Sequence, residues 1–418
     1  MQRKTQTIWT SFLALLLLLL QGAAPLAAAG EPVEEPVEEP QADIDMLAHK
    51  VMKSQHLVGL AVGTVIDGQV DYLRGYGWQD REAEIPVDSR KTLFRWASIS
   101  KTLTGILAVK LATQGKLDLD RPITDYLKYY RVPPTYLQPC GEDSNGGDRG
   151  QEAASPCRDG FRDVPLESAQ QVITMRQLLG HLGGIMHYSN GRGSPTPPNL
   201  KANDPQVNKG FAWALAYFDD KPLIAPPGTR FSYTTFGFNL AGAVLEAASG
   251  RSYADLLREH ITQPLDLDTL QPDYEWADLP NRAAGYRRFA GEVLRQGSSD
   301  VSWKLPGGGV ISTIKDLTDY CQGLLDDDLL TAAEKELLWT AQETSDGSST
   351  SYGLGFRVAE QDGRRQVEHG GSQQKAKTYL LAIPAEGTCV TVMSNSVHAD
   401  PRDIAGKLLT VLDQREPE

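Results

Sequence analysis

The sequence predicts an α+β fold, with one antiparallel sheet built from both ends of the chain. Two β-rich runs separated by an Asp-Gly pair lie near the amino end, and two further hairpin patterns lie near the carboxyl end. The sheet region is expected over about 42–96 and 300–418, with a mostly helical region over about 97–299. Terminal helices should cover one face of the sheet and the helical region the other, with a ligand cleft where the two regions meet.

The amino-terminal elements are a helix and a hairpin. Apolar residues recur there at helical spacing, namely Ile44, Leu47, Ala48, Val51 and Met52. Residues 57–77 then form a hairpin pattern that turns at Asp67-Gly68. From Ser98 the pattern becomes helical again, and Gly115 is expected to end that helix.

The carboxyl-terminal elements are two hairpins and a closing helix. Residues 352–371 form a hairpin pattern that turns at Asp362-Gly363, and residues 377–395 form another that turns near 384–387. The closing helix carries apolar residues on one face, namely Ile404, Leu408, Leu409 and Leu412. The intervening loops over 131–170 and 188–210 show no periodic pattern.

The start of the chain has the pattern of a secretory signal peptide. Basic residues precede an apolar run over 12–20, and small residues follow at 27–29. The run is shorter than the roughly 20 residues that span a bilayer, so we expect cleavage near Ala29 and no stable membrane span afterwards. The expected organisation is a signal peptide over 1–29, an extended Pro- and Glu-rich linker over 30–41 and a folded domain over 42–418, in a secreted or periplasmic protein.

Composition and charge limit the partners that we expect. The chain of 418 residues is 40% hydrophobic and 23% charged, which is typical of a globular protein. Its formal net charge of −13 repels phosphate backbones, so no nucleic-acid partner is expected. The expected partner is a small-molecule or peptide substrate, and the sequence does not predict an oligomeric state.

The chain has four cysteines, which fall into two groups. Cys140 and Cys157 flank a polar, Gly-rich stretch, and a disulfide between them would hold that loop by roughly 3 kcal/mol. Cys321 and Cys389 lie in apolar segments, and we expect them to be buried free thiols. None of the spacings is that of a zinc site, so no metal and no organic cofactor are expected.

Three Ser-x-x-Lys patterns occur, and their contexts differ: Ser98 and Lys101, Ser312 and Lys315, Ser372 and Lys375. The second is better explained as a helix start, where Thr313 and Asp316 form a capping pair. The third lies at a predicted strand start, where residues three apart point to opposite faces. Only the first places serine and lysine side by side, at the start of a helix.

The Ser98–Lys101 pair has the chemistry of a nucleophile and its base. A serine hydroxyl is a weak nucleophile until a base takes its proton, and a lysine can serve as that base where burial or nearby cations lower its pKa. The N–H groups at a helix start also suit a developing oxyanion. The local sequence leaves open the alternative that Ser98 is only a helix cap.

Five segments, in order, resemble the serine β-lactamase and penicillin-recognising family, especially class C enzymes and their esterase and peptidase relatives. They are FRWASISKTLTGILAVKLATQGKLDLD, ITMRQLLGHLGGI, PPGTRFSYTTFGFNLAGAVLEAASG, LPGGGVISTIKDL and VEHGGSQQKAKTYLLAIP. The resemblance spans about residue 45 to the carboxyl end, and the sequences of these segments are most similar to the LACTB-like serine protease branch. It implies a β-lactamase/transpeptidase-like fold and a catalytic domain.

The resemblance also implies roles for individual residues. Ser98 matches the acylated nucleophile, Lys101 its activating partner, and Tyr233 the tyrosine that moves a proton between Ser98, the leaving group and water. Thr235 stands where many class C enzymes have asparagine. His181 matches a histidine that is usually structural.

The strand His369-Gly370-Gly371 matches the family's Lys-Thr-Gly strand, with histidine in place of lysine. A protonated His369 would favour a tyrosinate or bind a substrate carboxylate, and a neutral one would do neither as well. The glycines allow the backbone to approach an acyl group closely. The backbone N–H groups of Ser98 and Ser372 match the oxyanion hole.

The sequence therefore predicts a secreted serine hydrolase that forms an acyl-enzyme on peptide, amide or ester substrates. Thr235 and His369 make β-lactams the less expected substrates. Two alternatives stay open at this point: a β-lactamase or D-alanyl-D-alanine carboxypeptidase, and a non-catalytic penicillin-binding-like binder or scaffold.

Overall fold

The computed structural model describes residues 41–140, 156–158, 160–188 and 212–415. The expected signal peptide and nearly all of the expected linker therefore lie outside the described residues. The first helix, α1, runs from Ala42 to Gln55, over the residues whose apolar spacing predicted it. Within the described ranges, every helix falls short of the length and apolarity that crossing a bilayer requires.

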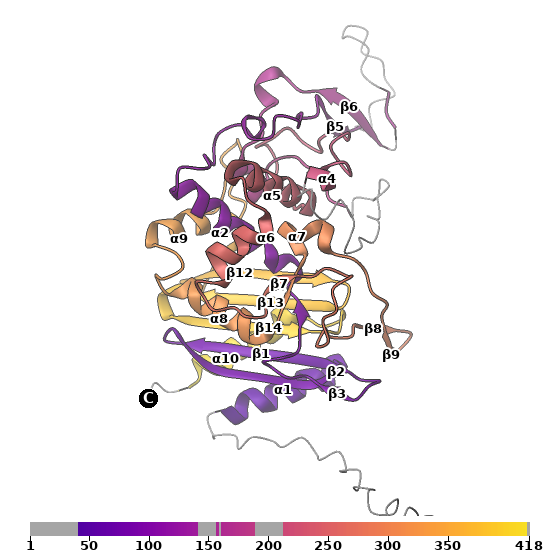
Figure 1. The fold of residues 1–418 in the computed structure, drawn as a ribbon, viewed down its shortest axis with the longest axis vertical. Coiled ribbons are helices and arrows are strands. Elements are labelled where there is room, and N and C mark those ends of the chain that lie inside the picture. The colour runs from indigo at the N-terminus through magenta and orange to yellow at the C-terminus, as the bar shows by residue number, and fades with distance from the viewer. Residues whose placement is uncertain (1–40, 141–155, 159, 189–211, 416–418) are drawn as a thin grey trace, which may run out of the picture. The chain divides into compact units, whose positions relative to one another are not determined.

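Seven strands form one antiparallel sheet in the order β11-β12-β13-β14-β1-β2-β3. Their bounds are β1 Gly59–Ile66, β2 Gln69–Asp80, β3 Ile85–Pro86, β11 Arg357–Gln361, β12 Arg364–Gln373, β13 Ala376–Ile383 and β14 Thr388–Ser394. β1 pairs with β14, with Leu60 opposite Ser394, so strands from the two ends of the chain are direct neighbours. Figure 1 shows the indigo β1 and β2 continuing the yellow carboxyl-terminal strands. The predicted sheet built from both chain ends is confirmed.

The two predicted Asp-Gly turns have the backbone conformation that these residues favour. Asp67 and Gly68 have φ angles of 49° and 73°, and Asp362 and Gly363 have φ angles of 55° and 74°. Positive φ at both central residues is typical of the two-residue hairpin turn whose twist matches that of its strands. These turns join β1 to β2 and β11 to β12.

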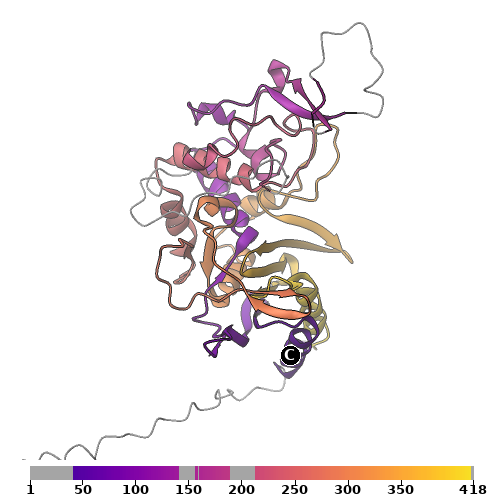
Figure 2. The same cartoon turned by 90° about the vertical axis from the view of Figure 1, so that its right-hand side faces the viewer.

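The two faces of the sheet are buried in different cores. Leu60 and Val392 pack with the terminal helices α1 and α10 (Pro401–Asp413), whereas their chain neighbours Ala61 and Met393 pack with the helical region. Successive residues of a strand point to opposite faces, so these strands are apolar on both. Figures 1 and 2 show α1 and α10 on the same side of the sheet.

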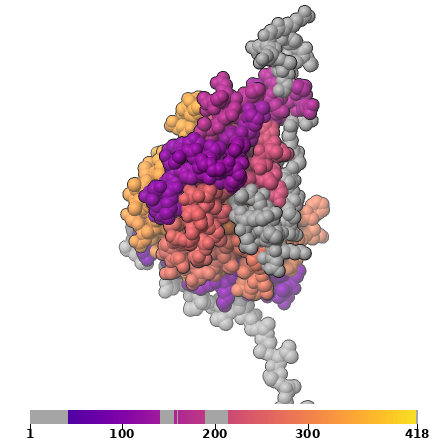
Figure 3. All heavy atoms as spheres, turned by 45° about the horizontal axis from the view of Figure 1, so that its top comes forward, coloured from indigo at the N-terminus to yellow at the C-terminus, as the bar shows by residue number. Residues whose placement is uncertain are grey.

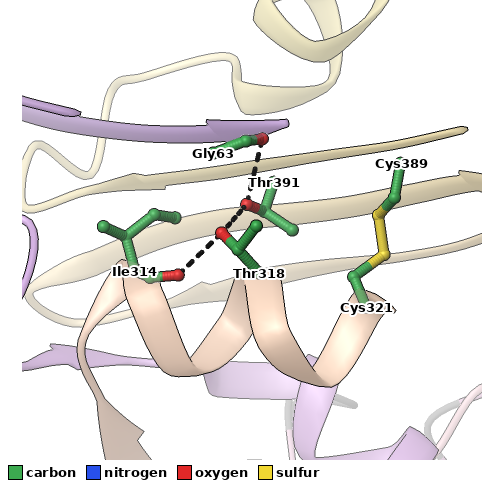
Figure 4. The surroundings of a disulfide bond; sticks show 6 residues. All are labelled: Gly63, Ile314, Thr318, Cys321, Cys389 and Thr391. Carbon is green, nitrogen blue, oxygen red and sulfur yellow. Dashed lines mark hydrogen bonds between the residues drawn. A yellow bond between two sulfur atoms is a disulfide. The ribbon is translucent and has the colours of Figure 1, made fainter. Parts of the chain in front are cut away.

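A disulfide ties helix α8 (Ile314–Leu325) to the sheet (Figure 4). Cys321 of α8 is bonded to Cys389 of β14, and both residues are fully buried. The expectation that these cysteines are free thiols was wrong. The burial of both cysteines was predicted correctly from their apolar segments. Their pairing was not, because only the packing of α8 on β14 brings the two segments together.

A chain of hydrogen bonds runs beside this disulfide (Figure 4). The Thr318 hydroxyl donates to the Ile314 carbonyl at 2.8 Å and lies 2.8 Å from the Thr391 hydroxyl, which donates to the Gly63 carbonyl at 3.2 Å. A Cβ atom on Gly63 would lie only 2.0 Å from Thr318 Oγ1. Helix and sheet thus approach so closely at this point that only glycine fits without movement.

Helix α8 and the helical region cover the opposite face of the sheet from α1 and α10. Helix α2 (Ser100–Thr113) lies within the helical region and has 11 buried residues, as is typical of a helix that is surrounded by core. In Figure 3 the purple segment that follows α2 lies beside the salmon-coloured segment around α6. The remaining α-helices are α3 Met175–Leu179, α4 Ala212–Leu215, α5 Thr235–Ser249, α6 Tyr253–Leu257, α7 Leu305–Gly308 and α9 Ala332–Trp339.

Short strands and turns complete the described chain. The strands are β4 Phe94–Arg95, β10 Val310–Ser312 and β7 Gln271–Pro272 in one small sheet, and the hairpins β5 Thr135–Pro139 with β6 Phe161–Pro165 and β8 Tyr286–Phe289 with β9 Glu292–Arg295. The short helical turns are η2 Ala97–Ile99, η3 Ile123–Asp125, η4 Ser168–Gln170, η6 Arg258–Thr262, η7 Ser302–Lys304 and η8 Pro384–Glu386.

The hairpin of β5 and β6 lies in a segment where the sequence showed no pattern. Its side chains are half-buried or exposed, so the strands lack the apolar alternation that would have predicted them. The Cys140–Cys157 disulfide, which the spacing predicted, follows β5 directly and precedes β6.

Candidate active site

Ser98 lies in the single turn η2, between strand β4 and helix α2. We expected Ser98 to open the helix, but α2 begins two residues later, at Ser100. The residues at the cap positions of η2 and α2 are Trp96 and Ile99, and neither makes a side-chain cap hydrogen bond. The alternative in which Ser98 is only a helix cap is therefore wrong.

The turn that presents Ser98 is held from several sides. Ala97 has φ 49°, a left-handed conformation that residues other than glycine adopt at a cost. The Trp96 indole donates to Ser312 Oγ at 2.6 Å, and the Thr378 hydroxyl of β13 donates to the Trp96 carbonyl at 2.9 Å. These contacts fix the turn against both the small sheet and the large one.

Gly371 permits strand β12 to lie against this turn. A Cβ atom on Gly371 would lie 2.3 Å from the Trp96 carbonyl oxygen, 2.1 Å from Thr378 Oγ1 and 3.0 Å from Ala97 Cβ. Real Cβ atoms do not approach a backbone oxygen so closely, so a side chain at this position would push the strand and the turn apart. The glycine therefore sets the distance between β12 and Ser98.

Lys101 lies one turn along from Ser98 and is fully buried. Its Nζ atom lies 2.6 Å from the Gly307 carbonyl oxygen, 3.2 Å from Thr235 Oγ1 and 3.2 Å from Ser98 Oγ. Burial lowers the pKa of Lys101 well below its ordinary value, and the charge of Lys304 lowers it further. A neutral amine can donate to Gly307 and Thr235 and still offer its lone pair to the Ser98 hydroxyl.

Tyr233 immediately precedes the segment that forms α5. Its hydroxyl is hydrogen-bonded to Ser98, and its ring centre lies 4.8 Å from Lys101 Nζ. Burial raises the pKa of Tyr233 above its ordinary value of 10.0, while the Ser98 hydrogen bond lowers it in part. The expected tyrosinate is thus disfavoured, and the group in the site is a neutral phenol that can donate a proton.

His369 is held in a single neutral form. Its Nδ1 atom lies 2.8 Å from the Gly370 carbonyl oxygen, which can only accept, so Nδ1 carries the proton. Its Nε2 atom lies 2.8 Å from the Tyr352 hydroxyl and accepts from it. Burial, followed by the charge of Lys101, lowers the pKa of His369 to about 3. The protonated form that would favour a tyrosinate or bind a carboxylate is therefore not the form at neutral pH.

The predicted site residues line one cleft of about 460 Å³. Seven of them contribute to its wall, namely Ser98, Tyr233, Thr235, His369, Gly370, Gly371 and Ser372. Lys101 lies behind this wall and contacts it through Ser98 and Thr235. The disulfide residues Cys140 and Cys157 are not part of the lining. The structure thus brings the hydroxyl, the phenol and the glycine-rich strand to one cavity, with the amine directly behind Ser98.

A family model described as Beta-lactamase matches residues 44–413. The chain belongs to the beta-lactamase family. This is a family of serine hydrolases.

Known proteins of this fold are similar along most of the chain. The mitochondrial serine beta-lactamase-like protein LACTB of Mus musculus is 25% identical, in a match that covers 81% of this chain and 72% of that protein. An octameric penicillin-binding protein homologue from Pyrococcus abyssi has a TM-score of 0.68 at 23% identity, and the match covers 90% of this chain and 78% of that one. A D-stereospecific amidohydrolase from Streptomyces sp. has a TM-score of 0.63 at 20% identity, covering 87% of this chain and 97% of that one. The predicted β-lactamase/transpeptidase-like fold is confirmed.

Sequence reasoning missed several residues of this beta-lactamase-family site. His187 lines the cleft and accepts from the Thr235 backbone N–H at 3.3 Å. Burial, followed by the charges of Lys101 and Lys304, lowers the pKa of His187 to about 4. Tyr352 holds His369, as described above. No motif marks these residues, although Lys304 directly precedes the LPGGG segment and His187 follows GHLGGI closely.

His181 has the structural role that the family resemblance implied. It is fully buried, and its Nδ1 atom accepts from the Thr234 backbone N–H at 3.1 Å. Its ring centre lies 4.3 Å from that of Tyr233. His181 therefore positions the chain that carries Tyr233 without reaching Ser98.

Proposed function

We propose that this chain hydrolyses peptide, amide or ester bonds through an acyl-enzyme formed on Ser98. The observation that carries the proposal is the contact of the Ser98 hydroxyl with both a buried, low-pKa amine and a neutral phenol at one cleft. A base and an acid that both contact one hydroxyl are what acyl transfer needs.

The geometry supports the following sequence of proton transfers. Lys101 accepts the Ser98 proton as Oγ attacks the substrate carbonyl, and the resulting oxyanion is bound by the backbone N–H groups of Ser98 and Ser372. Tyr233 then protonates the leaving group, and its phenolate regains a proton from Lys101. Water releases the acyl group by the same transfers in reverse. Apart from the substrate's leaving group and water, every proton carrier in this sequence belongs to the chain.

Two features favour simple amides and esters over β-lactams as substrates. Thr235 offers a hydroxyl where many class C enzymes have an amide, and that hydroxyl already lies 3.2 Å from Lys101 Nζ. His369 is neutral and is engaged by Tyr352 and Gly370, so it does not supply the cation that a lysine would in that place. A D-stereospecific amidohydrolase among the similar folds is consistent with amide substrates.

We further propose that the protein is exported to a secretory or periplasmic compartment. The signal-like segment over 1–29 motivated this expectation. All four cysteines are paired, as is typical of proteins that fold in an oxidising compartment. Fractionation of cells that express the full chain, followed by amino-terminal sequencing, tests it. A protein that stays in the reducing cytoplasm with residues 1–29 intact would contradict export.

Labelling with a fluorophosphonate tests the acyl-enzyme proposal. The adduct should map to Ser98 by mass spectrometry and should be absent in Ser98→Ala, whereas Ser54→Ala, an exposed serine on α1, should label normally. A panel of a p-nitrophenyl ester, an anilide, nitrocefin and a D-Ala-D-Ala peptide then separates the substrate classes. Labelling that persists in Ser98→Ala would contradict the assignment. Labelling of Ser98 without turnover of any substrate would favour the non-catalytic binder.

A further inference from the structure

The cleft is not confined to the face of the sheet that carries Ser98. On β12, His369 lies opposite Leu380, which packs in the core below the helical region. The next residue, Gly370, lies opposite Tyr379, which packs with the terminal helices. Directly opposed residues point to the same face, and both His369 and Tyr379 line the cleft. The cleft therefore has walls on both faces of the sheet.

The two parts of the cleft are connected around the edge of β12. Strand β11 pairs with β12 only as far as Arg357 opposite Glu368. From His369 onward, β12 pairs with β13 alone among the described strands. A Cβ atom on Gly370 would lie 3.2 Å from the Tyr379 ring, so glycine leaves open the space beside the ring that a side chain would fill. An extended substrate can thus pass from Ser98 around this edge to the second face.

On the second face the cleft ends in a charged group of residues that we call the far lobe: Glu368, Lys377, Tyr379 and Arg402. Glu368 is buried and accepts hydrogen bonds from the Tyr379 hydroxyl and from the Arg402 guanidinium, the latter at 3.3 Å. Arg402 therefore balances the charge of Glu368. Lys377 is half-buried, and its side chain has no hydrogen-bond or ion-pair partner among the described residues. The far lobe carries one cation in excess.

A second unpaired cation lies at the edge itself. The Arg357 side chain lines the cleft, is exposed and also lacks a hydrogen-bond or ion-pair partner within the described part of the chain. Its charge reaches the reacting groups, because it lowers the pKa of Tyr233. Lys101 lies behind the cleft wall, and His369 is engaged by Tyr352 and Gly370, so the cations that line the cleft are Arg357 and those of the far lobe. They lie in a chain of net charge −13, so the cleft differs in sign from the protein as a whole.

We propose that Arg357 and the far lobe bind a carboxylate of the substrate, held across the β12 edge from the bond that is cleaved. The inference rests on the proposed acyl-enzyme function, and it names the substrate class of that site. The carboxylate can come from an acidic group on the acyl part or from a free carboxyl terminus on the leaving part. In both cases Lys377 and Arg357 gain the anionic partner that the chain itself does not provide.

The test compares substrates that differ only in this charge. One arm uses p-nitrophenyl hydrogen suberate and its methyl ester, which place a carboxylate or a neutral group at the far end of one acyl chain. The other arm uses short peptides with a free or an amidated carboxyl terminus. In one of the arms kcat/KM for the charged form should exceed that for the neutral form by about three- to tenfold, as one partly exposed ion pair allows. The arm that shows the gain identifies the source of the carboxylate.

Variants then assign the gain to the far lobe. Lys377→Gln should remove most of it and Lys377→Glu should reverse it, each measured as the ratio of kcat/KM for the charged and the neutral substrate, so that a general loss of activity cancels. Lys407→Gln is the matched control, since Lys407 also lies on the surface of the α10 side but pairs with Asp403 outside the cleft. High salt should reduce the gain in the wild type. Thermal unfolding of each variant checks that it is folded.

The outcomes separate this inference from the proposed function. Turnover of p-nitrophenyl acetate with equal kcat/KM for charged and neutral substrates in both arms would overturn the far lobe and leave the hydrolase intact. A gain that persists in Lys377→Glu and Arg357→Gln would overturn it as well. Absence of any Ser98-dependent turnover or labelling would instead overturn the acyl-enzyme function on which it rests.

Discussion

Replacing Gly371 by alanine should separate strand β12 from the nucleophile turn. The added Cβ would lie 2.3 Å from the Trp96 carbonyl oxygen, and real Cβ atoms keep at least 3.0 Å, so the gap must widen by about 0.7 Å. Trp96 O belongs to the backbone and has no rotamer that avoids the clash. Thr378 Oγ1, at 2.1 Å, can rotate away only by giving up its hydrogen bond to Trp96.

The expected result has two parts. Overpacking of this kind should lower the free energy of unfolding by about 1–3 kcal/mol, measured by urea denaturation. Because β12 carries Ser372 and the turn carries Ser98, the two proposed oxyanion donors also move apart. A misplacement approaching 1 Å should lower kcat by about 100-fold. Activity is measured on a p-nitrophenyl ester and normalised to the fraction of protein that a fluorophosphonate labels.

Gly63→Ala is the matched control. Its added Cβ would lie 2.0 Å from Thr318 Oγ1 and 2.8 Å from Thr391 Oγ1, a similar clash on the sheet but between side chains away from the cleft. It should lower stability while leaving kcat of the folded protein nearly unchanged. The reasoning is refuted if Gly371→Ala keeps wild-type kcat, or if Gly63→Ala loses as much kcat as Gly371→Ala does.

Four further predictions test the groups around Ser98 and the sheet. Lys101 must be unprotonated to accept a proton, so kcat/KM should rise with pH through an ionisation well below the ordinary lysine value of 10.5 and then stay level; a rise only near 10.5 would contradict this. The pKa of His369 is lowered from 6.5 to about 3, so the unfolded chain binds a proton that the folded chain does not, and stability should fall as pH falls through this window. Urea titrations should show a smaller loss in His369→Gln, and an unchanged loss would argue against the buried neutral ring. Tyr233→Phe should lower amide hydrolysis by about 100- to 10,000-fold while leaving the fold intact, and wild-type rates in that variant would exclude it as the acid. Replacing both Cys321 and Cys389 by alanine should lower stability by about 4 kcal/mol, since their bond closes a loop with a sequence separation of 68 residues, and an unchanged melting temperature would contradict a structural disulfide.

Much of the fold was predictable because its signals are local. Asp67-Gly68 and Asp362-Gly363 favour positive φ at both positions, and this property alone locates two hairpins. The apolar spacing of α1 and α10 likewise depends on residues within a few turns. The pairing of Cys321 with Cys389 was not predictable, because it depends on how α8 packs on β14, and no local pattern records that packing.

The candidate site also has features that the sequence predicts and features that only the structure shows. Ser98, Lys101, Tyr233 and the glycine-rich strand lie in recognisable segments, and the structure places them at one cleft. Their protonation was less predictable, since burial rather than residue type decides it. Tyr233 is a phenol and His369 is a neutral ring because both are enclosed. Arg357 belongs to the cleft because β11 begins there, opposite Glu368 of β12, and no local sequence pattern predicts this pairing.

The pairing of β1 with β14 also sets when the cleft can form during synthesis. A nascent chain contains Ser98 and Lys101 before it contains β12, which supplies one wall of the cleft, and β14, which joins the two halves of the sheet. Until β14 leaves the ribosome, the amino-terminal hairpin has no neighbour on its β14 side. The order of translation therefore delays assembly of the cleft until these later strands have been made.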